Sequence, residues 1–331
     1  MKILLRLSLV MALLAISGFA GNTFAQEMQS ARPKAPAVDA TPGQDQDDNV
    51  ELPKVIFRSL NNIGGDDNRA AHNGSRKSKF STLAVPQNGI QYHGGPVMRT
   101  TKNVYIIWYG TWSSTAKTIL TNLAQSLGGS PYFNINTTYT DSAGTPLTNS
   151  VTYAGSTTDN YSLGKSLSDS AIRSVVSSAI TSGRLPRDAN GVYFVLTASD
   201  VTATSGFCTR YCGWHTHATI SSTDIKYAFV GNAARCITSC AAQSTGPNGD
   251  AGADGSASIF AHELEEAVTD PDLNAWFDTS GEENADKCAW TFGTTSTASN
   301  GSKFNMTLGG RNYLIQQNWV NASGGFCAKS R

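Results

Sequence analysis

The sequence has few charged residues and no excess of either sign, since Lys, Arg, Asp and Glu make up 15% of its 331 residues and the formal net charge is zero. The absence of a basic patch argues against a nucleic-acid-binding protein. No segment beyond residue 25 is long and apolar enough to span a bilayer, which argues against a membrane-spanning domain. Ser, Thr, Gly and Asn are abundant instead, a composition that suits an extracellular, loop-rich β or α+β protein.

The N-terminus has the pattern of a secretory signal peptide covering residues 1–25. Lys2 and Arg6 are its only charges, and the apolar run over 7–20 is too short for a transmembrane helix. Small residues ending at Ala25 form a cleavage site. The protein is therefore expected to be secreted, or periplasmic if its source is bacterial.

Two further regions follow the signal peptide. Residues 26–88 are rich in Pro, Ala, Gln and Asp with little to bury, which predicts a disordered leader or pro-segment. Residues 89–331 form the expected globular domain.

Alternating strand and helix patterns within this domain predict an α+β or α/β fold, with a mixed sheet packed against helices and the last helix lying across the sheet, as in many zincins. Apolar runs predict buried strands and spaced apolar residues predict helices, with a capping-box pattern over 166–169 opening the second helix. The expected strands are 103–109, 132–139, 151–153, 192–196 and 226–230, and the expected helices are 114–127, 166–182 and 257–271.

No cysteine precedes Cys208, and the chain contains six. An even number in a secreted chain favours three disulfides. We expect the pairs Cys208–Cys212, Cys236–Cys240 and Cys288–Cys327, with crossed pairing between the two C-x-x-x-C segments as the alternative.

The last predicted helix carries the pattern H-E-x-x-E. His262 and Glu266 are four residues apart, so both side chains leave the same side of the helix and could hold one metal ion. Glu263 occupies the position of the general base in the zincin pattern H-E-x-x-H. Ser256 is the expected N-cap, and Pro271 ends the helix. The alternative is an acidic, solvated helix face.

Several segments between residues 90 and 331 resemble the plant EXORDIUM family, also called the phosphate-induced protein family. They occur in the family's order and are Q-Y-H-G-G-P-V-M (91–98), V-Y-I-I-W-Y-G-T-W (104–112), F-C-T-R-Y-C-G-W-H (207–215), the glycine-rich loop 246–255, A-H-E-L-E-E (261–266), N-A-W (274–276) and E-N-A-D-K-C (283–288). The resemblance implies an extracellular protein, linked in plants to growth and to carbon or phosphate status, without a settled catalytic activity.

A metal site needs a third ligand beyond His262 and Glu266. Asp286 is preferred and Glu283 is close behind, because both lie about 20 residues downstream, as in gluzincin-like sites, and match the family's E-x-x-D-x-C. A Cys288–Cys327 bridge would hold this turn rigid. His215 matches the family motif and could be a fourth ligand or an oxyanion donor, the alternative being a packed histidine.

The resulting hypothesis is a secreted zinc hydrolase acting on peptide or amide bonds. The ion would acidify a water molecule, and Glu263 would take its proton. The alternative is a non-catalytic extracellular growth, matrix or signalling protein with a structural metal or none, and a third possibility is carbohydrate binding through tryptophans. The partner is an unknown extracellular substrate or matrix component, and the expected oligomeric state is a monomer.

Overall fold

The computed structural model describes residues 89–331. The predicted signal peptide and leader (1–25 and 26–88) lie outside the described residues and stay predictions. None of the helices in the described region is long and apolar enough to cross a membrane.

A five-stranded mixed sheet forms the centre of the domain, in the order β3-β2-β5-β8-β7. Four strands are parallel and β7, at one edge, is antiparallel to β8. The central strand β5 is buried along its whole length, as its continuous apolar sequence predicts. These strands are β2 (Lys102–Tyr109), β3 (Val151–Asp159), β5 (Gly191–Thr197), β7 (Gly213–Ile220) and β8 (Thr223–Gly231).

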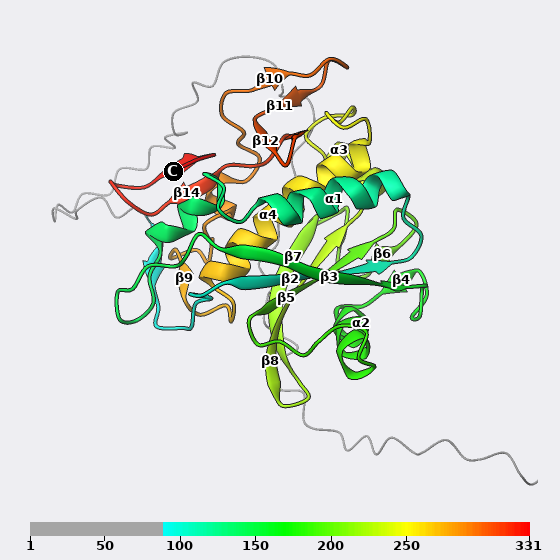
Figure 1. Cartoon of the computed structure of the whole chain (residues 1–331), viewed down its shortest axis with the longest axis horizontal. Coiled ribbons are helices and arrows are strands. Elements are labelled where there is room, and N and C mark those ends of the chain that lie inside the picture. The colour runs from blue at the N-terminus through cyan, green and yellow to red at the C-terminus, as the bar shows by residue number, and fades with distance from the viewer. Residues whose placement is uncertain (1–88) are drawn as a thin grey trace, which may run out of the picture. The chain divides into compact units, whose positions relative to one another are not determined.

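Helices cover both faces of this sheet. Figure 1 shows α1 (Ser114–Ser126) and α4 (Ala251–Thr269) side by side over one face, and α2 (Asp169–Thr181) on the opposite face. Because α1 and α2 each bury one apolar stripe, their other sides face solvent. In α4 every residue from Gly252 to Thr269 is buried, so this helix lies inside the domain. The predicted mixed sheet packed with helices is confirmed.

Short elements connect and flank this core. An antiparallel pair joins β1 to β9, which lie far apart in the chain, and several small β-ribbons follow α4. The remaining elements are β1 (Gln91–Tyr92), η2 (Phe133–Thr138), β4 (Ser166–Leu167), β6 (Thr202–Ala203), η3 (Ala233–Cys236), α3 (Ile237–Cys240), β9 (Trp276–Phe277), η4 (Asp286–Cys288), β10 (Ser296–Thr297), β11 (Lys303–Phe304), β12 (Met306–Leu308), β13 (Arg311–Tyr313), β14 (Asn318–Val320) and β15 (Phe326–Ala328).

The helix that carries H-E-x-x-E begins six residues earlier than predicted. Asp250, rather than Ser256, is its N-cap and accepts a hydrogen bond from the backbone N–H of Ala253. Position 252 in this helix requires glycine, because a Cβ there would lie 2.6 Å from the Cβ of Ala234. The glycine therefore permits close packing of α4 on η3, and the helix ends at Thr269, before Pro271.

Two further local predictions were wrong. The segment 132–139 is not a strand but contains the 3₁₀ helix η2, in which the hydroxyls of Thr137 and Thr138 donate to carbonyls three residues earlier. Helix α2 is capped by Ser168, whose hydroxyl accepts from the N–H of Ala171, so the expected start at residue 166 was also wrong. Residues 166–167 form the short strand β4 instead.

The disulfides are Cys208–Cys236, Cys212–Cys240 and Cys288–Cys327. The third pair is as predicted, but the first two follow the crossed alternative. The two C-x-x-x-C segments lie against each other, so each cysteine finds its partner across the pair of segments, with Cα–Cα distances of 5.8 and 5.4 Å.

Candidate metal centre

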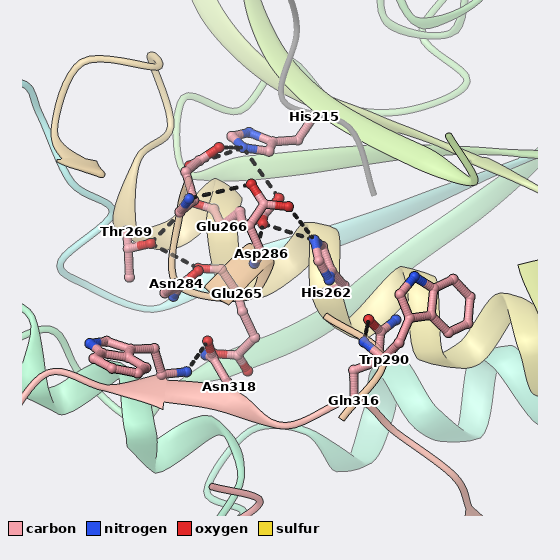
Figure 2. A network of polar contacts seen from close by, with 12 residues as sticks. His215, His262, Glu265, Glu266, Thr269, Asn284, Asp286, Trp290, Gln316 and Asn318 are labelled. Atoms are coloured by element: carbon pink, nitrogen blue, oxygen red, sulfur yellow. Dashed lines mark hydrogen bonds and ion pairs between the residues drawn. The ribbon is translucent and has the colours of Figure 1, made fainter. Parts of the chain in front are cut away.

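The acidic residues of α4 are buried, so the alternative of a solvated helix face is wrong. His262, Glu263 and Glu265 are 0% exposed and Glu266 is 1% exposed. Glu265 points away from the histidine, and its Oε2 accepts a hydrogen bond of 2.7 Å from the Nδ2 of Asn318 (Figure 2). A buried carboxylate costs stability unless it is paired or binds a metal, so the others need partners.

Three of the predicted ligands meet around His262. Its Nε2 lies 2.8 Å from Oε1 of Glu266 and 3.5 Å from Oδ1 of Asp286. Although both oxygens are close, His262 Nε2 forms no hydrogen bond with either of them. Donor atoms on one tetrahedral zinc ion lie about 3.3 Å apart. The distance to Asp286 is close to this value, and that to Glu266 is shorter and would lengthen slightly around an ion.

His215, the histidine of β7, lies on the other side of Glu266. Its Nε2 is 3.0 Å from Oε2 of Glu283 and 3.8 Å from Oε2 of Glu266. Figure 2 shows the carboxylates of Glu266 and Asp286 between the rings of His215 and His262. The two oxygens of Glu266 therefore face different histidines.

Two hydrogen bonds, one from its backbone and one from a side chain, fix the turn that supplies Glu283 and Asp286 to α4. The N–H of Asp286 donates to Oε1 of Glu266 at 3.2 Å, and the Nδ2 of Asn284 donates to the carbonyl of Glu265 at 3.1 Å. The Cys288–Cys327 disulfide connects the same turn to β15. The sequence left open which of Glu283 and Asp286 is the third ligand, and the structure brings both to the centre.

Glu263 lies beside the centre but in neither group of ligand atoms. Both its carboxylate oxygens are buried without a hydrogen-bond partner. Its space depends on Gly213, the first residue of β7, because a Cβ there would lie 2.6 Å from Oε1 of Glu263 and 2.6 Å from Cγ2 of Ile259. Gly213 thus lets the strand of His215 approach the helix of His262.

The first testable prediction concerns this close approach. Gly213→Ala should lower the free energy of unfolding by about 1–3 kcal/mol, because the added methyl group must displace Glu263 or Ile259. Chemical denaturation measures the loss. In a Glu263→Ala background the same substitution should cost less, and an equal cost in both backgrounds would contradict the proposed contact.

Burial and mutual repulsion shift the proton affinities of these groups. Burial, followed by the charge of Glu266, raises the pKa of both Glu263 and Glu283 well above the usual range. Burial and repulsion from Asp286 raise the pKa of Glu266 to about 7. Burial lowers the pKa of His215 to about 3, whereas at His262 it is outweighed by Glu266 and the other acids, which raise the pKa. His262 is therefore the one group of the five that favours a positive charge, whereas burial favours the neutral form of His215 and of the acids.

Sequence reasoning missed strand β7, and with it the contact between His215 and Glu283. In the segment 213–220 apolar and polar residues do not alternate regularly, since Trp214, Thr216 and Ala218 share one face, so the segment is not recognised as a strand. His217, on the same strand, forms a separate group with Asp224 and Asp272. Lys226 pairs with both of these carboxylates, so that group already has a cation. Four of the six tryptophans are buried in the core (Trp108, Trp112, Trp214 and Trp290).

Comparison with known proteins identifies the family to which the chain is related. A family model described as the phosphate-induced protein 1 conserved region matches residues 90–328. Protein EXORDIUM-like 3 and Protein EXORDIUM-like 5, both from Arabidopsis thaliana, are 35% and 33% identical over 70% of this chain and over 80% and 75% of their own lengths. Protein PHOSPHATE-INDUCED 1 of Nicotiana tabacum is 30% identical over 58% of this chain and 68% of its own.

No solved structure matches the chain, so the zincin-like arrangement expected for the site helix stays a prediction. The family match covers the central sheet and every residue of the candidate centre. The chain belongs to the phosphate-induced protein 1 family, together with the EXORDIUM-like proteins.

Proposed function

We propose that this chain is an extracellular, non-catalytic protein that holds a divalent metal ion, zinc by its donor set, between α4 and the turn at 283–288. His262, Glu266 and Asp286 would be the ligands. The ion would fasten the turn to the helix and thereby stabilise the surface that the protein presents outside the cell.

The observation that carries this proposal is the unsatisfied nitrogen of His262. A buried ring nitrogen without a hydrogen bond is costly, and the nearest oxygens, from Glu266 and Asp286, stand at separations typical of ligands on a common ion. One imidazole with two carboxylates is a donor set that zinc accepts.

Burial favours a stabilising ion over a catalytic one. A catalytic zinc needs an open position that substrate can reach. His262 and Glu266 are buried, and the side chain of Asp286, the most accessible ligand, is 15% exposed. The three disulfides and the family match fit an extracellular protein.

A metal-dependent peptidase or amidase is the second candidate. The observation in its favour is Glu263, which follows His262 in the chain and whose buried carboxylate has no hydrogen-bond partner. Such a carboxylate could accept a proton if the centre opened to a peptide substrate. The two candidates differ in whether Glu263 affects a reaction or only the stability of the fold.

Metal analysis and one isosteric substitution test these candidates. The purified chain should contain stoichiometric zinc by mass spectrometry, and Glu263→Gln should retain it. Both proteins should give the same hydrolysis rate on casein and on a panel of amide and ester substrates. Absence of bound metal would overturn the proposal. Hydrolysis by the parent chain that falls by a factor of 100 or more in Glu263→Gln would establish the second candidate, on the usual scale of general-base catalysis of about 10²–10⁴-fold.

A further inference from the structure

The candidate centre contains two groups of ligand atoms rather than one. His262 and Asp286 belong to the first group, His215 and Glu283 to the second, and Glu266 to both. Within each group the donor atoms lie within 4.8 Å of one another. Each group thus offers one imidazole, one carboxylate of its own and one oxygen of a shared carboxylate.

The geometry of Glu266 decides how the two groups relate. Its Oε1 lies 2.8 Å from Nε2 of His262, whereas its Oε2 lies 3.8 Å from Nε2 of His215. A carboxylate whose two oxygens face different nitrogen ligands is arranged to bridge two ions. In two-metal sites of proteins the ions lie about 3.5–4 Å apart, a spacing that one carboxylate can span.

The number of carboxylates in the centre matches the charge of two divalent ions. Four carboxylates gather here, from Glu263, Glu266, Glu283 and Asp286. Among the described residues the only basic side chains in ion-pair contact with them are the two histidines. If all four are ionised, one divalent ion leaves two negative charges in a buried region, whereas two ions balance them.

From this arrangement we infer that the chain binds two divalent metal ions side by side, one on His262 and Asp286 and one on His215 and Glu283, with Glu266 bridging them. The inference rests on the proposed metal-binding function and deepens it. It assigns His215 as a ligand of the second ion. From the sequence, His215 was considered as a fourth ligand of a single ion, an oxyanion donor or a packed histidine.

The second ion would fasten a different part of the fold. His215 lies on the edge strand β7, and Glu283 lies in the turn before η4. Because Cys212, three residues before His215, is bound to Cys240, β7 is already anchored near its start. An ion between His215 and Glu283 would join β7 to the turn, while the first ion joins the turn to α4.

Metal counting on the full chain and its variants tests the inference. After loading with Zn²⁺ and removal of excess ion, the parent chain should hold two ions. Glu283→Gln and His215→Ala should each hold one, and so should Asp286→Asn. His217→Ala, two residues along β7 and outside the centre, is the matched control and should hold two. Circular dichroism reports whether each variant folds, and Glu283→Gln preserves side-chain volume if His215→Ala does not fold.

Loading with Mn²⁺ provides a second readout that stoichiometry alone lacks. Two adjacent ions should give a spin-coupled paramagnetic resonance spectrum, which Glu283→Gln should convert to that of isolated Mn²⁺. If the parent chain holds a single ion and His215→Ala and Glu283→Gln still hold it, the second site is overturned and the proposed function stays intact. One ion lost in every ligand variant would mean a single ion shared by all five ligands, which also overturns the inference. No bound ion would refute both proposals.

Discussion

Glu266→Gln should release the bound metal and make the melting temperature insensitive to chelators. Glu266 is the residue shared by both ligand groups, and its carboxylate also accepts the N–H of Asp286. Loss of a residue that only hydrogen-bonds to a metal ligand lowers metal affinity about 10–100-fold, so loss of the ligand itself should lower it at least about 100-fold. Metal titration by calorimetry measures the change directly.

A chelator should change the melting temperature of the parent chain but not that of Glu266→Gln. With free ion at about 100 times the dissociation constant, binding stabilises the native state by about 2.7 kcal/mol. For a domain of this size that is about 5–10 °C in melting temperature. EDTA should therefore lower the melting temperature of the parent chain by that amount and leave Glu266→Gln unchanged.

Glu265→Gln is the matched control for this experiment. Glu265 is the preceding residue, is equally buried and accepts a hydrogen bond from Asn318, which a glutamine oxygen can also accept. It belongs to neither ligand group. If Glu265→Gln lost metal to the same extent as Glu266→Gln, general damage to α4 would explain the result and the ligand assignment would be wrong.

Removing the Cys288–Cys327 disulfide should reduce both stability and metal affinity. The bond closes a loop with a sequence separation of 39 residues. In the chain-entropy model this constrains the unfolded state by about 4 kcal/mol, which corresponds to about 10 °C in melting temperature. Because Cys288 ends the 3₁₀ turn that begins at Asp286, the double variant Cys288→Ser/Cys327→Ser should also bind metal about 10–100-fold more weakly.

Cys208→Ser/Cys236→Ser separates these two effects. That bond closes a loop of similar size, with a sequence separation of 28 residues, but neither cysteine adjoins a proposed ligand. Because the Cys212–Cys240 bond still closes nearly the same loop, this double variant should lower the melting temperature by less, and it should change metal affinity little. Equal loss of affinity in both double variants would show that the disulfides act on the centre only through overall stability.

The sequence predicted four of the five strands of the sheet and the three long helices, because those segments carry strong apolar patterns. Buried runs such as β5 and one-sided helices such as α1 can be recognised without tertiary information. The start of α4 was missed because its glycines were attributed to a loop. Gly252 and Gly255 are instead selected by close neighbours, the side chains of Ala234 and Ala233, which no local pattern reveals.

The candidate centre was predicted only where its residues lie on one helix. The spacing of His262 and Glu266 specifies their proximity, since residues four apart in a helix are neighbours. The preference for Asp286 agrees with its 3.5 Å distance to His262. The contact between His215 and Glu283 joins residues 68 positions apart and depends on how β7 pairs with β8, which lies beyond helical or strand spacing.

The uneven accessibility of the five proposed ligands has a kinetic consequence. The side chains of His215, His262, Glu266 and Glu283 are at most 2% exposed, and that of Asp286 is 15% exposed. An ion would therefore reach the centre most readily on the side of Asp286. Exchange with free metal should be slow, so loading with Zn²⁺ and removal by EDTA should follow the rate of local opening there rather than the rate of diffusion.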